Sequence, residues 1–282
     1  MTVPFSLLTE FVARYPAQPA TAFLRSIEID RLASVMDAEG LGLDLGCGDG
    51  ILTDILFNRV GKTPRLVGID LDPLETEAAA AYPFYERIHT CPADAIPEAD
   101  GTFDYVVSNS VLEHIPDLES VIREVARVLK PAGRFYFTVP GPGFHENLRG
   151  SVIGVDRSRY LADLDRRLAH FHYLSSADWA AMCDRHGLRL DQVDGYIDPS
   201  ETRRWENLSR VTGGLLHALS FGKSRPIEIQ RALKLRSIQN SVRLPKAVAT
   251  VLAKTITLGL GEHGEDGTPA CLLVTGGKDS VA

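Results

Sequence analysis

The chain lacks most features of secreted, membrane-spanning or zinc-binding proteins. Its four cysteines are too widely spaced for a CxxC or Cys/His pattern, so we expect a reducing compartment and no structural metal. No apolar run reaches about 18 residues, and residues 1–10 lack a basic segment followed by an apolar one, so neither a spanning helix nor a secretory signal is predicted. The formal net charge of −7 argues against a general nucleic-acid binder.

Two nucleotide-binding fingerprints are also missing. No Gly-Lys-Ser/Thr occurs, which excludes the common ATP phosphate loop. The dinucleotide pattern G-x-G-x-x-G fails because position 51 is Ile. What stands there instead is Asp-x-Gly-x-Gly-x-Gly, from Asp44 to Gly50, between the apolar run 41–45 and a helix-compatible stretch, 51–57.

A second short apolar run, residues 66–70, ends on an acid, Asp70. Glycines let a backbone turn sharply and approach a ligand closely. An acid at the tip of the following strand can accept hydrogen bonds from both hydroxyls of a ribose. The pattern therefore predicts a nucleotide-type site.

The rest of the chain repeats a strand–helix rhythm. Strands are expected at 103–108 and 134–139, with a helix between them that Asp117 caps and that Pro131 and Gly133 stop. Alternating apolar strands and helices favour an α/β fold with a doubly wound, mostly parallel sheet. Ligands of such sheets sit beyond the carboxyl ends of the strands. The polar residues expected at that rim are Asp44, Asp70, Asp94 and Asn109.

Several further motifs stand in a fixed order along residues 91–97, 103–115, 127–133 and 172–187. With these motifs, the chain resembles the class I S-adenosylmethionine-dependent methyltransferases, and among them the group called methyltransferase type 11. The resemblance covers roughly residues 25–196 and a last strand at 271–275. It implies a seven-stranded Rossmann-like sheet with a helical insertion before the last strand. One departure is Ala132, where the family has glycine, and the turn should remain feasible through Gly133.

The resemblance implies S-adenosyl-L-methionine as cofactor. The glycine loop would pass under its aminoacyl part, Asp70 would bind the ribose, and Asp94 would bind the adenine amino group. Asp44 is expected both to cap the loop amides and to face the amino group of the cofactor. The full set of implied cofactor-binding residues is Asp44, Gly46, Cys47, Gly48, Asp70, Leu71, Asp94, Ala95 and Asn109.

The acceptor side is less defined. A sulfonium methyl is already electrophilic, so alignment suffices unless the acceptor is a weakly acidic hydroxyl or a protonated amine. His114 and His172 are the candidate catalytic residues, although His114 equally fits a structural hydrogen-bonding role in its turn. Arg25, His170 and Tyr173 are candidates for the acceptor pocket, although Arg25 also fits an exposed ion pair with Glu28. No metal is expected, because His170 and His172 lack a carboxylate at a clear ligand spacing.

We expect four regions: an N-terminal helical cap region (1–40), the methyltransferase core (41–196), a mostly helical insertion (197–269) and the last strand with the C-terminus (270–282). The insertion is locally basic, since Glu228 is the only acid from Lys223 to Lys254. A basic amphipathic stretch in an acidic protein favours an anionic partner at 223–258, such as a membrane surface or a phosphate-bearing molecule. A solvated helical face packed on the core is an equal alternative.

These patterns predict a methyltransferase that acts on a small acceptor, anionic or linked to a lipid or sugar. It would be cytoplasmic, either free or peripheral at the inner face of the membrane, with no nucleic-acid partner. The alternative function is a non-catalytic cofactor-binding module that regulates or scaffolds a partner.

Overall fold

The computed structural model describes residues 3–16, 18–150, 156–210, 244–260 and 265–280. By its internal contacts the chain forms two compact units. The first unit comprises residues 1–30, 143–169 and 196–270, and the second comprises 31–142, 170–195 and 271–282. Residues 211–243, which include the first part of the basic stretch 223–258, lie outside the described residues. The four-part functional division stays a prediction.

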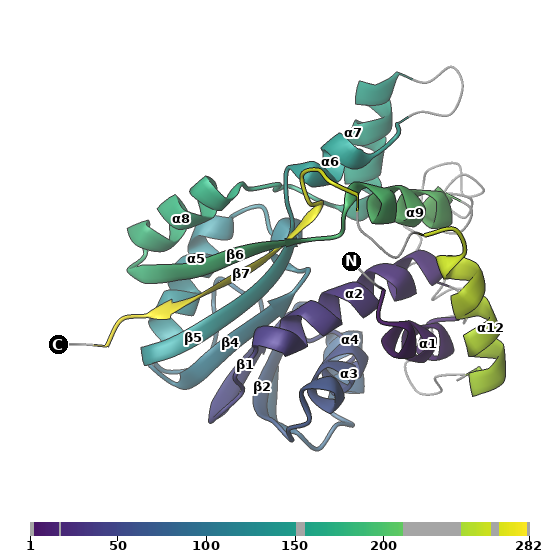
Figure 1. Ribbon diagram of the computed structural model, residues 1–282. Coiled ribbons are helices and arrows are strands. Elements are labelled where there is room, and N and C mark those ends of the chain that lie inside the picture. Colours follow the sequence, from purple (N-terminus) through teal and green to yellow (C-terminus); the bar gives the residue numbers. More distant parts are fainter. Residues whose placement is uncertain (1–2, 17, 151–155, 211–243, 261–264, 281–282) are drawn as a thin grey trace. The chain divides into compact units, whose positions relative to one another are not determined.

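A seven-stranded sheet is the framework of the second unit (Figure 1). Its order is β3-β2-β1-β4-β5-β7-β6. Every pairing from β3 across to β5 is parallel, and β7 runs antiparallel to β5. The strands are β1 (Leu41–Leu45), β2 (Arg65–Asp70), β3 (Tyr85–Thr90), β4 (Phe103–Asn109), β5 (Leu129–Pro140), β6 (Leu188–Tyr196) and β7 (Cys271–Lys278). The predicted doubly wound, mostly parallel sheet is confirmed.

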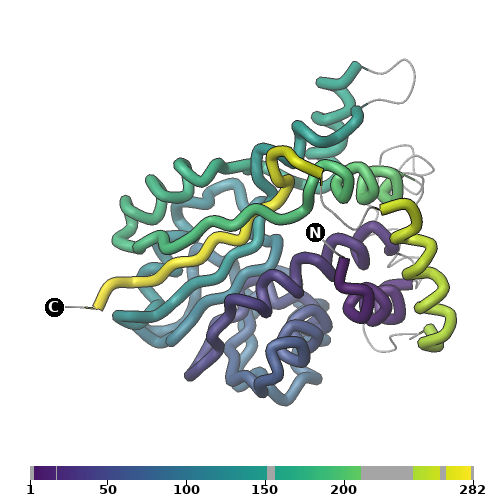
Figure 2. Tube along the Cα trace, viewed as in Figure 1, coloured from purple at the N-terminus to yellow at the C-terminus, as the bar shows by residue number. Residues whose placement is uncertain are grey.

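The last strand of the chain is an interior strand of the sheet. Figure 2 shows β7, in yellow, running between β5 and β6. The strands β3 and β6 form the two edges of the sheet. β3 has only β2 as a neighbour, and none of its residues is fully buried. This edge position explains why β3, unlike the strands of the interior, has no apolar run that sequence analysis could recognise.

Helices cover both faces of this sheet (Figure 1). On one side lie α3 (Ile51–Val60) and α4 (Pro73–Ala79), and on the other α5 (Leu118–Val128) and α8 (Ser176–Arg185). Asp117 caps α5 as predicted, its side chain accepting from the Ser120 amide at 3.2 Å. The apolar face of α5 packs with the sheet and with Trp179 of α8 in one buried core.

The first unit is helical. Its elements are α1 (Phe5–Arg14), most of α2 (Pro19–Val35), α6 (Gly143–Asn147), α7 (Arg157–Leu168), α9 (Pro199–Ser209) and α12 (Lys246–Thr257). α1 packs against α12, and α6 against α9, where the rings of Phe144 and Trp205 lie 5.1 Å apart. The described parts of the predicted insertion, α9 and α12, are helices, as expected. In the part of the chain that is described, no helix is long and apolar enough to cross a membrane.

Candidate functional site

The sheet of the second unit changes its winding direction at β1. The chain runs outward from β1 through β2 to β3, then returns to place β4 on the other side of β1. In doubly wound folds, the crevice beyond the carboxyl ends of the strands at such a point is the usual ligand site. Asp44, Asp70 and Asn109 lie at these ends of β1, β2 and β4.

The loop after β1 is built around left-handed glycines. The amides of Gly46 and Cys47 both donate to the Ile69 carbonyl at 2.9 Å, which ties the loop to β2. Gly46 has a φ of +81°, and a Cβ there would lie 2.4 Å from a methyl group of Val111. This glycine is required by the protein's own packing.

Gly48 differs from Gly46 in what surrounds it. Its φ is +52°, and a Cβ there would meet only Glu75 Oε2, at 3.9 Å. The space beside the backbone at this position is open. Because Gly48 has no side chain and lies beside open space beyond the strand ends, a cofactor can approach its backbone closely.

Asp70 is held against the same loop. Its Oδ2 accepts from the Gly48 amide at 3.0 Å, and its Oδ1 accepts from the Asp72 amide at 2.9 Å. A carboxylate has about four lone-pair positions, so both oxygens keep capacity for the hydroxyls of a ligand. The structure thus joins the glycine loop and the acid that the sequence singled out. The next residue, Leu71, is 72% exposed.

Asp44 is buried, and its partners are neutral. The hydroxyls of Thr53 and Tyr85 both donate to its Oδ2, at 2.6 and 2.5 Å. Burial raises the pKa of Asp44 to about 6, although the two hydroxyl hydrogen bonds work against that rise. The amides of Gly46 and Cys47 donate to the Ile69 carbonyl and the Gly48 amide donates to Asp70, so these three loop amides have partners other than Asp44. Burial likewise raises the pKa of the neighbouring Cys47 thiol, which keeps it neutral.

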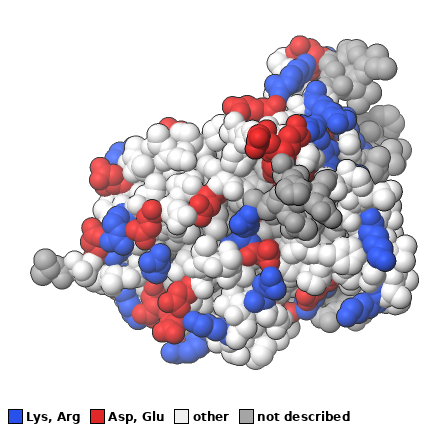
Figure 3. Space-filling view, viewed as in Figure 1, with Lys and Arg blue, Asp and Glu red and all other residues white. Residues whose placement is uncertain are grey.

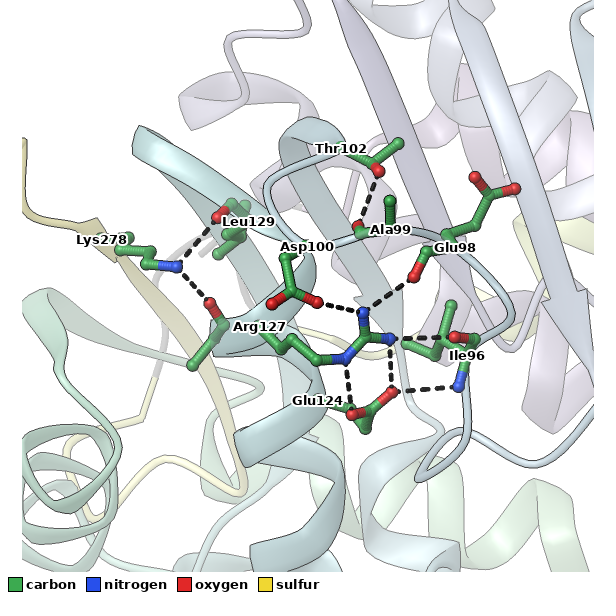
Figure 4. A network of polar contacts seen from close by, with 10 residues as sticks. Ile96, Glu98, Ala99, Asp100, Thr102, Glu124, Arg127, Leu129 and Lys278 are labelled. Atoms are coloured by element: carbon green, nitrogen blue, oxygen red, sulfur yellow. Dashed lines mark hydrogen bonds and ion pairs between the residues drawn. The ribbon is translucent and has the colours of Figure 1, made fainter.

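Asp94 and Ala95 lie on an exposed loop after β3. The Ala95 amide, which the resemblance would direct to the adenine ring, donates to the Pro92 carbonyl at 3.2 Å. The far end of this loop is fixed by Arg127 of α5 (Figure 4). Its guanidinium donates to the carbonyls of Ile96 and Glu98 at 2.9 and 2.8 Å.

Glu124 completes this network. It pairs with Arg127 at 2.8 Å and accepts from the Ile96 amide at 3.1 Å, as Figure 4 shows. The Arg127 hydrogen bonds hold the pKa of Glu124 below its usual range. In the sequence, Arg127 stands out only as part of the motif at 127–133. Its position one helical turn after Glu124 is the signal that could have revealed a positioning pair.

A histidine cluster follows β4. Ser110 has a left-handed φ of +49°, and the chain then forms the short 3-10 helix η1 (Leu112–His114). The Glu113 side chain is 3% exposed and the His114 side chain 40% exposed, with Oε1 and Nε2 3.9 Å apart. The rings of His114 and His170 lie 5.1 Å apart.

Residues 170–173 are fastened to η1 by two hydrogen bonds. The Phe171 amide donates to the Glu113 carbonyl at 2.8 Å, and His172 Nε2 lies 2.8 Å from the Ile115 carbonyl oxygen, to which it donates. His170 Nδ1 is 3.0 Å from the Tyr173 hydroxyl. The second unit therefore brings His114, His170 and Tyr173 together, while His172 contacts the Ile115 carbonyl, and the candidate roles of the four residues stay predictions.

Arg25 belongs to the first unit. It pairs with Glu28, as one of the two interpretations expected. The pair is not exposed, however, because the Glu28 side chain is fully buried and also accepts from the Tyr196 hydroxyl at 3.0 Å. That correction makes Glu28 an anchor within the helical unit.

Comparison with known proteins identifies the family of this chain. A family model described as a methyltransferase domain matches residues 22–193. The chain belongs to this family and is a class I S-adenosylmethionine-dependent methyltransferase, whose members use S-adenosylmethionine as methyl donor.

Curated relatives include the ubiquinone biosynthesis O-methyltransferase of Xanthomonas oryzae, 28% identical over 206 residues that cover 70% of this chain and 81% of the relative. The enzyme of the same name from Chromobacterium violaceum is 30% identical over 179 residues, 61% of this chain and 73% of the relative. A crystal structure of a proposed sarcosine dimethylglycine methyltransferase from Galdieria sulphuraria shares the fold, with a TM-score of 0.54, 20% identity, and coverage of 94% of this chain and 90% of that one.

Proposed function

We propose that this methyltransferase, of the type 11 group, transfers a methyl group to a hydroxyl of a small acceptor that is anionic or linked to a lipid or sugar. The observation that carries the proposal is the contact between the glycine loop and Asp70 beside an open Gly48. The names of the curated relatives support O-methylation of a small molecule. We further propose a cytoplasmic location, either free or at the inner face of the membrane.

We assign cofactor binding to residues at the carboxyl ends of the strands. Asp70 accepts from the ribose hydroxyls with the lone pairs that the Gly48 and Asp72 amides do not use. Leu71 covers one face of the adenine with its exposed side chain. Asp94 accepts from the adenine amino group, while Arg127 holds the far end of its loop.

Asp44 receives the aminoacyl group. Both hydroxyl donors bind its Oδ2, so we assign Oδ1 to the ammonium of the cofactor. Cys47, within the glycine loop, and Asn109, at the end of β4, also belong to the proposed cofactor set. An ammonium beside Asp44 would favour the carboxylate over the protonated form that burial promotes.

The bound cofactor supplies an electrophilic sulfonium methyl group. The chain's own contribution is to align the acceptor oxygen in line with the C–S bond and to exclude water. We assign His114 of η1, whose side chain is 40% exposed, to take the acceptor proton. His172 Nε2 donates a hydrogen bond to the Ile115 carbonyl. We therefore assign His172 to holding the 170–173 segment in place. His170 and Tyr173 would contact the acceptor, and Arg25 remains a candidate acceptor residue of the first unit.

The proposal of a lipid-linked acceptor rests on the exposed side chains of α12. Ala249, Ala253 and Ile256 are buried, whereas Val248, Val251 and Leu258 are 46, 64 and 74% exposed. Lys246 and Lys254 are exposed on the same helix. In Figure 3 the right-hand edge, where Figure 1 places α12, is mostly uncharged with separate basic side chains. An apolar face carrying lysines favours an anionic lipid surface.

Calorimetry with S-adenosylmethionine, followed by turnover with labelled cofactor, tests the function. The acceptor panel should contain phenols, isoprenoid-linked phenols and phosphorylated sugars. Asp94→Ala should weaken S-adenosylmethionine and S-adenosylhomocysteine alike, because both carry adenine. Cofactor binding without turnover on any acceptor class would favour the scaffold function instead.

Co-sedimentation with anionic vesicles tests the lipid contact. Val251→Glu with Lys254→Glu should abolish a salt-sensitive association, while cofactor affinity stays unchanged. Equal sedimentation of the wild type and this variant would leave α12 as a solvated helical face.

A further inference from the structure

The end of β4 carries a group of three potential metal ligands. One ligand atom each from Glu113, His114 and His170 can be chosen so that all three lie within 4.8 Å of one another. We propose that these residues form a mononuclear site for a divalent transition ion, with open coordination positions for an oxygen of the methyl acceptor.

The donor set matches such ions. Two imidazoles and one carboxylate suit zinc, iron, cobalt or manganese, whereas calcium and magnesium prefer oxygen ligands alone. Two ligand atoms about 2.1 Å from one tetrahedral ion lie about 3.4 Å apart. Glu113 Oε1 and His114 Nε2 are 3.9 Å apart, so this pair would contract by about half an ångström around an ion. The three ligand atoms together lie within 4.8 Å of one another, so the widest pair would contract by up to about 1.4 Å.

Neighbouring residues hold the three proposed ligands in position. The Tyr173 hydroxyl lies 3.0 Å from His170 Nδ1, which fixes the ring and makes Nε2 the atom that we assign to the ion. The Phe171 amide and His172 hold the 170–173 segment to η1. Glu113 is almost fully buried, whereas 40% of the His114 side chain reaches solvent, so the ion has both a buried anchor and an entry path.

The cluster also stands beside the cofactor loop. Val111, which leads into η1, has its side chain where a Cβ of Gly46 would clash. An ion here would lower the pKa of a bound hydroxyl, and the hydroxyl proton would pass to water. As the acceptor oxygen forms its bond to the methyl carbon, the C–S bond breaks and its electron pair stays on sulfur. His114 is then a ligand and not the proton acceptor.

The test uses untagged full-length protein dialysed against a chelator. Titration with Co²⁺, followed by its visible spectrum, and Zn²⁺ calorimetry should show one saturable site per chain. His114→Ala and His170→Ala should each weaken binding at least tenfold, and Tyr173→Phe about tenfold. His186→Ala is the matched control, because His186 contacts a different carboxylate, Glu119, at 2.5 Å, and should bind the ion like wild type.

Acetohydroxamate, a bidentate oxygen donor, should shift the Co²⁺ spectrum if coordination positions are open. An unchanged spectrum would overturn the acceptor role. No saturable binding, or a loss in only one of the two histidine variants, would overturn the ligand set. The role of the ion in binding the acceptor rests on the proposed function, whereas ion binding itself does not. Calorimetry with S-adenosylmethionine on the metal-free protein tests cofactor binding alone, so it distinguishes a failure of the ion site from a failure of the proposed function.

Discussion

Two buried carboxylates of the helical unit have different partners from the two acids at the strand ends of the sheet unit. In the helical unit, Glu206 is 1% exposed and pairs with Arg210 at 2.9 Å. It also accepts from the Arg149 amide and the Tyr160 hydroxyl, at 3.0 and 2.8 Å. Glu28 of the same unit has Arg25 and the Tyr196 hydroxyl as partners. Each carboxylate has a cation.

In the sheet unit the two acids at the strand ends have neutral partners. Asp44 has two hydroxyls and Asp70 has two backbone amides. Among the described residues, no Lys or Arg forms an ion pair with either acid. Glu28 and Glu206 of the helical unit therefore serve the fold, whereas Asp44 and Asp70 of the sheet unit remain suited to a ligand that brings cationic or hydroxyl groups.

The largest effect should come from filling the open space at the glycine loop. We expect Gly48→Val to weaken S-adenosylmethionine binding more than about a hundredfold, because its side chain would occupy the proposed ligand position. Calorimetry measures the loss. Gly61→Val is the matched control, since Gly61 also has a positive φ of +75° and nothing within 4 Å of a Cβ. Equal loss in both variants would mean that the backbone strain, not the ligand position, matters.

Breaking a cation-paired carboxylate should mainly lower stability. Glu206→Ala leaves the partly buried Arg210 without its partner and removes two further hydrogen bonds, so we expect a loss of about 3 kcal/mol in the free energy of unfolding. Urea denaturation of the full chain measures it. Asp44→Asn should cause no comparable loss, because it removes a buried charge that has no cation. Similar destabilisation by both would break the distinction between the units.

Removing the acid at the end of β2 should mainly weaken binding. Asp70→Ala should cost about 1.5–3 kcal/mol of cofactor affinity, roughly ten- to a hundredfold. The dissociation constants of the wild type and the variant can be compared by calorimetry. Undiminished binding would refute the ribose assignment.

Asp44 should make cofactor binding pH-dependent. Burial raises the pKa of Asp44 in the free protein to about 6, above the ordinary aspartate value of 3.8, so the carboxyl is mostly protonated below pH 6. If an ammonium binds the carboxylate, the affinity should fall up to about tenfold per pH unit below pH 6. It should be highest near pH 7, because the α-amino group of the cofactor begins to lose its proton around pH 8. Calorimetry from pH 5 to 8 measures this dependence, and Asp44→Asn should flatten it.

The order of the motifs made the core of the fold predictable. The apolar runs at 41–45, 66–70 and 103–108 coincide with interior strands, because strands buried on both faces must be apolar throughout. The same logic missed β3, whose edge position permits polar residues. The rim acids followed from strand order, since parallel strands end at one edge of the sheet.

The sequence could not reveal contacts made by distant segments. Glu113 and His170 come from separate parts of the chain, and only the folded 170–173 segment brings them together. The burial of Glu28 likewise depends on Tyr196, a partner far along the chain. Spacing along the chain carries no signal for such contacts, because they arise from tertiary packing.

The smallest expected effect concerns the turn after α5, and it contrasts one residue with its neighbour. Sequence analysis expected Gly133 to make the turn feasible, yet the left-handed residue is Ala132, with a φ of +62°. Gly133 instead avoids a close contact, since a Cβ there would lie 2.8 Å from the Lys130 carbonyl oxygen.

An alanine in the left-handed region costs about 1 kcal/mol relative to glycine. Ala132→Gly should therefore raise the free energy of unfolding by up to about 1 kcal/mol in urea denaturation, whereas Gly133→Ala should lower it. A less stable Ala132→Gly variant would mean that the added freedom of the unfolded chain outweighs the relief of strain.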